Sequence, residues 1–410
     1  MQILVTGCAG YIGSIICQTL IQENHSVIGL DNLSTGFRKN IPQAVKFYEG
    51  DIADTALLKE IKNSHPELNS VIHLAGFIEV AESVKNPEKY FDNNFHKAKS
   101  FLDSLEKLNF KNIIFSSTAA VYGIPQEYDS NGTVAEIGVQ QEYDSNGTVA
   151  ERASSRLRRT NDRSVLLVHE DHEDDENAEI GVPQQCHTAC INEGAVLAPI
   201  NPYGSSKLEF EKAIQASTLN YIIFRFFNVA GADGVLGECH EPETHLIPLL
   251  LDFALGKRED FSIYGNDYPT PDGTAIRDYI HVKDLAQAHL LALEALYINL
   301  QNENLTEHTA SPPKATNSTN IQRSGNINQI YNLGYGQGFS VKEIVNITEK
   351  LIDQKINYGL KPRRIGDPAY LVASPEKALR LLGFQPKFNS IETIIKDALE
   401  HRRTWYRKDQ

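Results

Sequence analysis

Residues 2–13 read Gln-Ile-Leu-Val-Thr-Gly-Cys-Ala-Gly-Tyr-Ile-Gly, an apolar run that leads into a turn with three glycines. The run is typical of a buried strand, and the helical pattern that follows extends from Tyr11 to Asn24. Gly7, Gly10 and Gly13 allow a tight turn and a close approach of the backbone to a pyrophosphate group, which a helix N-terminus favours. This order predicts a dinucleotide-binding turn, with a glycine-rich turn that binds nothing as the alternative.

Outward from this turn, apolar strands alternate with helical stretches. The strands are predicted at Val27–Asp31, Val45–Asp51, Val71–Ala75 and Asn112–Ser116. Near-continuous Val, Ile and Leu in such strands predict a parallel sheet that helices cover on both faces. Such sheets bind ligands beyond the carboxyl ends of their strands. We therefore predict the α/β class: a Rossmann-type doubly wound parallel sheet with a smaller α/β substrate-binding domain.

Composition and charge narrow the classes of function. Of the 410 residues, 41% are hydrophobic and 22% are charged, and the net charge of -14 argues against non-specific binding to nucleic acid or anionic membranes. No apolar run approaches the roughly 20 residues of a membrane helix, and the start of the chain lacks a signal-peptide pattern. Five scattered cysteines are typical of a reducing compartment, so we expect a cytoplasmic protein. Cys186, His187 and Cys190 match no common zinc spacing, so no metal site is predicted.

Two segments interrupt the alternation of strands and helices. The first, residues 123–198, contains the sequence QEYDSNGTVAE twice, at 126–136 and 141–151. We expect a mobile loop that arose by tandem duplication, with a partner-binding segment as the alternative. The second, residues 301–329, is rich in Asn, Ser and Thr and predicts a surface loop.

Two acidic side chains end predicted strands near the glycine turn. Asp31 follows Gly7 by 24 residues and ends the second strand. Its carboxylate can accept hydrogen bonds from an adenosine ribose and would repel a 2′-phosphate, which favours NAD over NADP. Asp31 could also cap a helix N-terminus, and both interpretations stay open. Asp51 and Ile52 end the third strand, where they can hold the edge of the adenine.

Tyr203 and Lys207 lie four residues apart at the start of a predicted helix and therefore share one face of it. A neighbouring ammonium group and a positively charged nicotinamide would both lower the pKa of the phenol from its reference value near 10. Tyr203 could then act as a general base near neutral pH. A Tyr-x-x-x-Lys sequence is by itself a weak signal. Here it follows the strand end Ser116-Ser117-Thr118, whose hydroxyl groups can reach the same centre.

Six stretches together resemble the extended short-chain dehydrogenase/reductase superfamily, and within it most closely the UDP-glucose 4-epimerase family. They are TGCAGYIGS (6–14), LDNLSTG (30–36), FSSTAAVYG (115–123), INPYGSSK (200–207), RFFNVAGA (225–232) and YGNDYPTPDGTAIRDYIHVKDLA (264–286). The resemblance implies an NAD-dependent isomerase of galactose metabolism. Such an enzyme interconverts UDP-galactose and UDP-glucose through a transient 4-keto sugar. The resemblance also implies a homodimer.

The resemblance assigns roles to individual residues. Tyr203 matches the catalytic base, Lys207 its electrostatic partner and ligand of the nicotinamide ribose, and Thr118 the hydroxyl that bonds the sugar. The residues that match NAD ligands are Gly7, Gly10, Tyr11, Ile12, Gly13, Asp31, Asn32, Asp51, Ile52, Leu74, Ala75, Gly76, Asn94 and Phe227. Those that match nucleotide-sugar ligands are Asn228, His245, Leu246, Tyr264, Arg277, Arg364 and Asp367. The two arginines suit a diphosphate and uridine because guanidinium groups form paired hydrogen bonds with phosphate oxygens.

Several positions depart from the family pattern. Ile78 stands where some members have a Lys that faces the cofactor, and His245 replaces a substrate-binding Asn but can still hydrogen-bond. The connection between Val121 and Tyr203 is longer than in the family and could cover the site. At the position that limits N-acetyl sugars, Leu371 is smaller than the Tyr of narrow members. UDP-N-acetylglucosamine is therefore expected as a further substrate.

Two other functions compete with this one. A nucleotide-sugar dehydratase of the same superfamily would carry an Asp-Glu pair after Thr118, where Ala119 and Ala120 stand instead. A non-catalytic NAD-binding protein would not need the intact set of Thr118, Tyr203 and Lys207.

The resemblance also divides the chain into domains. Residues 1–122 and 199–228 are expected to form the NAD-binding domain, and 229–410 mainly the substrate-binding domain. Segments at about 275–300 and 330–335 are expected to return to the NAD-binding domain.

Overall fold

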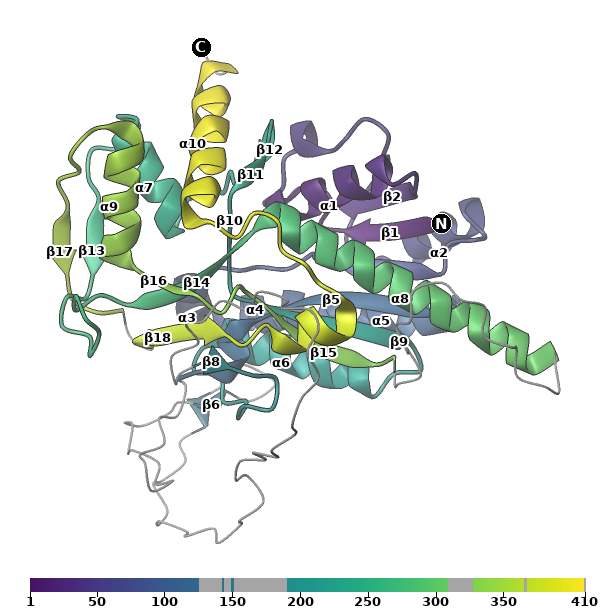
Figure 1. Cartoon of the computed structure of the whole chain (residues 1–410). Coiled ribbons are helices and arrows are strands. Elements are labelled where there is room, and N and C mark those ends of the chain that lie inside the picture. The colour runs from purple at the N-terminus through teal and green to yellow at the C-terminus, as the bar shows by residue number, and fades with distance from the viewer. Residues whose placement is uncertain (125–141, 144–148, 151–189, 309–326, 365–366, 409–410) are drawn as a thin grey trace, which may run out of the picture.

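The computed structural model describes residues 1–124, 142–143, 149–150, 190–308, 327–364 and 367–408, and for 142–143, 149–150, 301–308 and 408 only the backbone. Its central element is a seven-stranded parallel sheet (Figure 1). In spatial order its strands are β15 (Gln329–Leu333), β9 (Asn220–Phe226), β5 (Asn112–Thr118), β4 (Ser70–His73), β1 (Gln2–Thr6), β2 (Ser26–Asp31) and β3 (Lys46–Glu49). The predicted fold class, a doubly wound parallel sheet, is confirmed.

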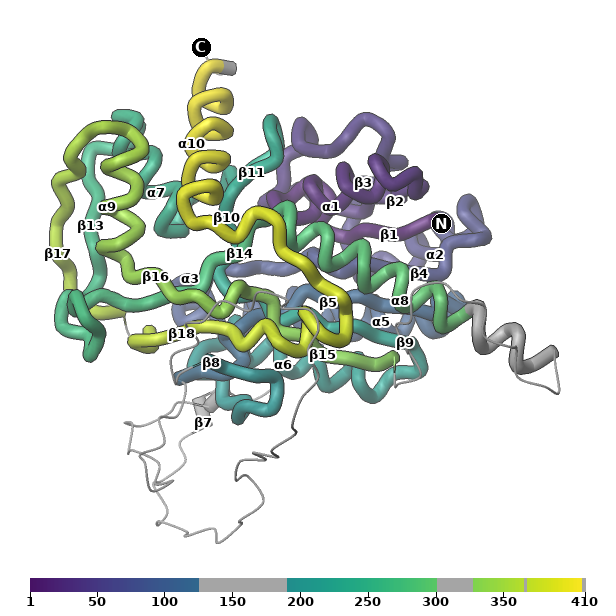
Figure 2. The backbone as a smooth tube through the Cα atoms, viewed as in Figure 1, coloured from purple at the N-terminus to yellow at the C-terminus, as the bar shows by residue number. Residues whose placement is uncertain are grey.

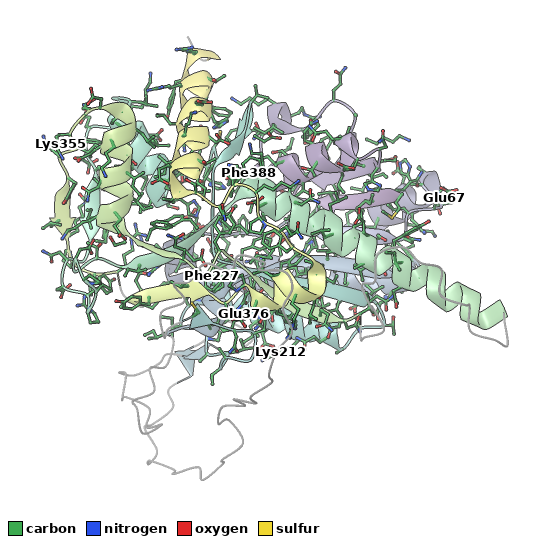
Figure 3. All side chains as sticks on the ribbon, viewed as in Figure 1. Glu67, Lys212, Phe227, Lys355, Glu376 and Phe388 are labelled. Carbon is green, nitrogen blue, oxygen red and sulfur yellow. The ribbon has the colours of Figure 1, made fainter. Side chains whose placement is uncertain are left out.

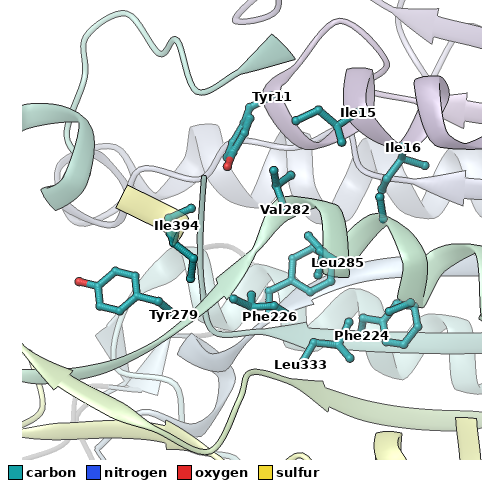
Figure 4. Packing of buried hydrophobic residues seen from close by; sticks show 14 of the residues in the cluster. Tyr11, Ile15, Ile16, Phe224, Phe226, Tyr279, Val282, Leu285, Leu333 and Ile394 are labelled. Atoms are coloured by element: carbon teal, nitrogen blue, oxygen red, sulfur yellow. The ribbon is translucent and has the colours of Figure 1, made fainter. Parts of the chain in front are cut away.

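Helices cover both faces of this sheet. One face packs against α1 (Tyr11–Gln22) and α8 (Val282–His308), and the other against α2 (Thr55–Ser64), α5 (Ala98–Lys107) and α6 (Pro202–Gln215). Side chains alternate between the two faces along β1, because Ile3 and Val5 belong to the first core and Leu4 to the second. In Figure 4, Ile15 and Ile16 of α1 lie across from Val282 and Leu285 of α8, beside the phenylalanines of β9.

Short elements connect the strands of the parallel sheet. They are η1 (Arg38–Asn40), α3 (Val80–Lys85), α4 (Pro87–Phe91), η2 (Asp92–Lys97) and η3 (Ala119–Tyr122). The polar connections place the carboxyl ends of β1, β2, β4 and β5 at one edge of the sheet, which is where a ligand is expected.

A second, smaller sheet lies next to this edge. It runs in the order β10 (Asn228–Ala230), β14 (Ile276–His281), β18 (Tyr370–Ala373) and β8 (Cys190–Ile191), with β16 (Gly338–Ser340) antiparallel to β14. Three two-stranded pairs accompany it: β11 (Ala232–Asp233) with β12 (Leu236–Gly237), β13 (Ser262–Tyr264) with β17 (Gly359–Lys361), and β6 (Glu142–Tyr143) with β7 (Val149–Ala150). The helical elements here are α7 (Leu246–Ala254), α9 (Val341–Ile352), η5 (Ala378–Leu382) and α10 (Ile391–Lys408). Figure 2 shows α10 standing beside α7 and α9 and away from the parallel sheet.

Residues that follow β9 connect the two sheets. Phe227 lies between β9 and β10 and packs in a small core with Val121, Ile191 and Ala373. In Figure 3 it lies near the middle of the molecule. The chain therefore passes from the parallel sheet to the second sheet beside the carboxyl end of β9.

The structure corrects two of the expected loop boundaries. Cys190 and Ile191, expected inside the loop at 123–198, form β8 and pair with β18, because the Ile191 side chain is buried against the core of the second sheet. Helix α8 continues to His308, beyond the predicted start of a loop at 301. No Pro or Gly interrupts it before Pro312, and extending an existing helix costs little. The repeats and Cys186 with His187 lie outside the described residues, apart from the backbone of β6 and β7.

Two findings concern the expected environment of the chain. Among the described residues, no helix has both the length and the apolar character that crossing a bilayer demands. The described cysteines, which are Cys8, Cys17, Cys190 and Cys239, form no disulfide bond with one another.

Candidate active site

A cavity of about 970 Å³ lies at the carboxyl ends of β1, β2, β4 and β5 and extends to the segment before α7. Of the fourteen residues predicted to bind NAD, thirteen line it: Gly7, Gly10, Tyr11, Ile12, Gly13, Asp31, Asn32, Asp51, Ile52, Leu74, Ala75, Gly76 and Phe227. The predicted catalytic residues Thr118, Tyr203 and Lys207 line the same cavity. Ile78, where some family members have a Lys, lies there as well.

The glycine turn is too tight for side chains at two of its three glycines. Gly7 adopts a φ of +73°, and a Cβ there would lie 2.8 Å from the backbone nitrogen of Ala75. A Cβ on Gly13 would lie 2.0 Å from the Gly7 carbonyl oxygen, whereas one on Gly10 would meet the same oxygen at 3.4 Å. No side chain caps the start of α1 at Gly10, so the first N–H groups of the helix are free to meet an anion. The turn therefore fits the pyrophosphate of a dinucleotide.

Asp31 holds the glycine turn against the loop that follows β2. Its two carboxylate oxygens accept hydrogen bonds from the backbone N–H groups of Ala9 (2.9 Å) and Leu33 (2.8 Å). Burial raises the pKa of Asp31, and these two hydrogen bonds act in the opposite direction. No helix begins at Asp31, so the alternative of a helix cap is wrong: the next helical residue is Arg38. Each oxygen keeps a further lone pair for a ribose hydroxyl.

Asn94 is the predicted NAD ligand that does not line the cavity. Its buried side chain accepts a hydrogen bond from the backbone N–H of Phe77 (2.8 Å) and donates one to the Phe77 carbonyl (2.9 Å). It therefore fixes the segment after Gly76, which does line the cavity.

The start of α6 aims Tyr203 and Lys207 at the end of β5. Asn201 caps the helix by accepting a hydrogen bond from the Gly204 N–H at 2.8 Å, and Pro202 occupies the first turn. The Thr118 hydroxyl accepts a hydrogen bond from the Ala120 N–H at 3.1 Å. Its own proton is then available to donate to the Tyr203 oxygen, with which it is hydrogen-bonded.

The pKa of Tyr203 differs from the expectation. Burial raises it, and the hydrogen bond from Thr118 offsets only part of this rise. The negative charge of Glu79 raises it further. In the chain alone the pKa of Tyr203 is therefore raised, and Lys207, from which we predicted a lowering, is not among the groups that shift it. We also predicted that a positively charged nicotinamide lowers the pKa of Tyr203, and that group belongs to the cofactor.

Lys207 is buried next to the predicted nicotinamide site. Its Nζ donates a hydrogen bond to the Ser116 carbonyl at 2.9 Å and lies 3.3 Å from the position of a Cβ on Gly76. Burial lowers the pKa of Lys207 to about 8, although the carboxylate of Glu211 acts to raise it. The ammonium group is thus held at the junction of β4, β5 and α6.

A buried polar network beneath this junction was not predicted. Arg225 forms two hydrogen bonds with Glu211, at 2.7 and 3.1 Å, and Ser117 donates a short hydrogen bond to the same carboxylate. Arg225 also donates to the Tyr122 hydroxyl at 3.0 Å, which in turn donates to the Asn332 side chain at 2.6 Å. The hydrogen bonds of this network connect α6 with the end of β5 and so hold Lys207 and Thr118 in position. Arg225 opens one of the motif stretches, which was the only signal in the sequence.

The predicted nucleotide-sugar ligands fall into two groups. Asn228, His245 and Leu246 line the cavity, as does Leu371. The other four do not: Arg277 forms an ion pair with Asp367, and the Arg364 guanidinium lies 4.4 Å from the centre of the Tyr264 ring.

Several further polar residues of the cavity were missed from the sequence. Glu79, Glu238 and His240 line it, and Thr244 donates a hydrogen bond to Glu79 at 2.6 Å. Glu79 lies in no motif stretch. The alternation of Glu and His from 238 to 245 is visible in the sequence and could have been noticed.

Comparison with known proteins agrees with this geometry. The NAD dependent epimerase/dehydratase family matches residues 3–169 and 179–304. UDP-glucose 4-epimerase of Streptococcus mutans serotype c is 38% identical over 405 residues, and that of Lacticaseibacillus casei 36% over 404, each alignment covering 97% of this chain and 96% of the relative. The crystal structure of UDP-glucose 4-epimerase from Brucella ovis in complex with NAD is 35% identical, with 98% of both chains covered and a TM-score of 0.71. The chain therefore belongs to the NAD dependent epimerase/dehydratase family and, within it, to the UDP-glucose 4-epimerases.

Proposed function

We propose that this chain interconverts UDP-galactose and UDP-glucose with bound NAD, and that Tyr203 is its acid–base residue. The observation that carries the proposal is the convergence of Thr118, Tyr203 and Lys207 on the cavity that the glycine turn lines. The glycine turn, which fits a dinucleotide, and an acid–base group lie in the same cavity. Together they suit the oxidation and the reduction of one substrate. The two small side chains after Thr118 disfavour a dehydratase, because neither Ala119 nor Ala120 can supply the acid and base for loss of water.

Tyr203 moves the proton at the sugar C4 hydroxyl. NAD held by the glycine turn, Asp31 and Gly76 would supply the hydride acceptor for C4 and the hydride donor for the opposite face of the 4-keto sugar. Tyr203 takes the hydroxyl proton as C4 is oxidised and gives it back as C4 is reduced. Thr118 lies within hydrogen-bonding reach of the phenolate and stabilises it by donation. The same two residues serve both faces because the sugar turns while the nucleotide stays bound.

Lys207 supports this step electrostatically. Its ammonium group is desolvated and fixed by the Ser116 carbonyl, so its positive charge acts at short range in a medium of low dielectric. It lies beside Gly76, next to the place where the nicotinamide ribose is expected. A charge at this position favours the phenolate form of Tyr203 once substrate and cofactor exclude water.

Binding of the nucleotide is assigned to residues on the second sheet. Asn228, His245 and Leu246 meet the substrate inside the cavity, and Arg277 and Arg364 hold the diphosphate and uridine beyond it. Arg277 is paired with Asp367 on neighbouring segments, which orients its guanidinium group before substrate binds. A cytoplasmic location and a homodimer complete the proposal; their support is the cysteine usage and the family resemblance.

A tyrosine pair in the same cavity tests the proposal. Tyr203→Phe removes the phenol hydroxyl and should lower kcat for UDP-galactose by about 10²–10⁴-fold, the usual contribution of general acid–base catalysis. Binding of NAD should be unchanged because the ring remains. Tyr90 is the matched control: its ring centre lies 6.4 Å from that of Tyr203, and its hydroxyl donates to Glu82 at 2.9 Å. An unaffected rate in Tyr203→Phe, or an equal loss in Tyr90→Phe, would contradict the role of Tyr203.

A further inference from the structure

One short segment at the wall of the cavity brings four metal-ligating side chains together. They are Glu238, His240, Glu243 and His245, called the 238–245 cluster below, and one ligand atom from each lies within 4.8 Å of all the others. The segment fills the connection between the end of β12 at Gly237 and the start of α7 at Leu246. Neither the glycine turn nor the acid–base group accounts for two carboxylates and two imidazoles converging here.

The distances within the cluster fit a small tetrahedral ion. His245 Nδ1 lies 2.7 Å from Glu238 Oε1 and 3.4 Å from Glu243 Oε1. His240 Nδ1 lies 3.2 and 4.0 Å from the same two oxygens. Nitrogen and oxygen ligands at about 2.1 Å from a tetrahedral Zn²⁺ are separated from one another by about 3.4 Å. The four separations bracket this value, so small side-chain shifts would complete the geometry.

One nitrogen atom of the cluster is buried without a hydrogen bond in the described part of the chain. Nδ1 of His240 is buried and has no hydrogen-bond partner among the described residues. Glu238 Oε1 lies 3.2 Å from it and makes an ion-pair contact with the ring. Buried polar atoms are normally paired, and an unpaired one points to an unseen ligand or ion. The side chain of His240 is 19% exposed, and those of Glu238 and Glu243 are each 8% exposed.

The buried charge around the cluster gives a second indication. Glu238, Glu243 and Asp252 are three buried carboxylates, and Arg402 bridges the last two at 2.7 and 3.3 Å. One guanidinium group leaves two negative charges among these four side chains, and the only groups paired with Glu238 in the described residues are the two imidazoles of the cluster. A dication compensates both, and Arg402 then orients Glu243 as groups behind metal ligands commonly do. Protons on both imidazoles would compensate the same charge, and metal binding distinguishes the two states.

We propose that the 238–245 cluster binds one divalent transition-metal cation, with Zn²⁺ the best match in ligand type and size. The role is positional. An ion held by Nδ1 of His245 leaves Nε2 of that ring available to the substrate and fixes the residues immediately before α7. The effect on the substrate rests on the proposed function, whereas binding of the cation does not.

Metal binding can be measured without reference to activity. The full-length chain is freed of metal by dialysis against a chelator and titrated with Zn²⁺, and bound zinc is counted by mass spectrometry. One equivalent per chain is expected. Co²⁺ in the same site should give the visible spectrum of tetrahedral nitrogen and oxygen ligands, without the charge-transfer band of a thiolate. His240→Ala and Glu238→Gln should each weaken Zn²⁺ binding by about 100-fold or more.

Two control variants separate this site from other metal ligands of the chain. Cys186→Ser and His187→Ala remove candidate ligands in the 123–198 segment and should keep the full stoichiometry and affinity. Thermal unfolding confirms that each variant folds. The proposal is overturned if the unaltered chain binds no more zinc than His240→Ala, or if the control variants lose the ion instead. Epimerase activity is assayed on the same preparations. An active chain that fails to bind zinc in the titration overturns only the metal site, and a chain that binds zinc but is inactive overturns only the proposed function.

Discussion

The two halves of the cavity are built in different ways. The cofactor half is mainly backbone: the glycine turn after β1 and the carboxyl ends of β2 and β4, all within the first 76 residues. The substrate half is mainly side chains that come from distant segments, among them Asn228, His245 and Leu371. A half made of closely packed backbone has no room for added atoms. A half made of side chains can change its ligand through single substitutions.

The two halves also differ in how many of the predicted binding residues line the cavity. In the cofactor half, all but Asn94 line one cavity. In the substrate half, Tyr264, Arg277, Arg364 and Asp367 pair with one another outside the lining. The proposed substrate must therefore reach past the cavity to these side chains, and the predictions below test each half separately.

After Tyr203→Phe, the largest effect is expected for Lys207→Met, at the junction of the two halves. Activity should fall by about 10²–10³-fold because the charge that favours the phenolate is lost. Stability should instead rise, because the pKa of Lys207 is lowered from 10.5 to about 8 by burial. Each unit of pKa corresponds to about 1.4 kcal/mol. Burial of the charged Lys207 therefore lowers the free energy of unfolding by roughly 3 kcal/mol at pH values where the amine is charged in both the folded and the unfolded state.

The gain in stability from Lys207→Met should become smaller as the pH rises. Below pH 8 the cost is complete, and it disappears as the pH rises from 8 through 10.5, where the amine is neutral in both states. Denaturant unfolding at several pH values should show the advantage of Lys207→Met over the unaltered chain shrinking in that window. An advantage that grows with pH would contradict the burial of a charged lysine.

Gly13→Ala is expected to damage the cofactor half. The added methyl would lie 2.0 Å from the Gly7 carbonyl oxygen, so the turn must move, at a cost of about 1–3 kcal/mol. Gly10→Ala is the matched control, because its Cβ would lie 3.4 Å from the same oxygen. Calorimetric titration with NAD should show a larger loss of affinity for Gly13→Ala than for Gly10→Ala. Equal affinities in the two variants would mean that backbone crowding does not define this half.

Arg364→Ala is expected to affect only the substrate half. Loss of a charge-assisted hydrogen bond of about 1.5 kcal/mol should raise KM for UDP-galactose roughly tenfold, with NAD affinity unchanged. The neighbouring Arg363 pairs with Asp267 at 2.7 Å and provides the matched control Arg363→Ala. Steady-state kinetics compare the two. An equal rise in KM for both variants would point to a general change of charge and not to a specific ligand.

The smallest effect on turnover of UDP-galactose is expected at the position that sets the choice of sugar. Because Leu371 lines the cavity and is smaller than Tyr, the chain should turn over UDP-N-acetylglucosamine as well as UDP-galactose. Leu371→Tyr should abolish turnover of the N-acetyl sugar and lower that of UDP-galactose by no more than a few-fold. Both substrates are assayed at equal concentration. Absence of turnover of the N-acetyl sugar by the unaltered chain would remove Leu371 as the determinant.

The sequence predicted what depends on neighbours along the chain. The glycine turn, Asp31 and the Tyr203–Lys207 pair are contiguous patterns, and each lines the cavity. The contacts of Arg225 with Tyr122 join residues 103 positions apart, which no local pattern reveals. A two-residue strand such as β8 is too short to show a period. The 238–245 cluster contains none of the cysteines that mark the common zinc spacings in a sequence.

One assay tests directly whether the chain interconverts UDP-galactose and UDP-glucose with bound NAD. The purified chain is incubated with UDP-galactose, without added NAD, and UDP-glucose is measured. Because each cycle regenerates NAD within the cavity, we expect conversion by cofactor that stays bound through purification. Absence of conversion, even after NAD is supplied, would contradict the assignment of Tyr203, Thr118 and Lys207 to epimerisation.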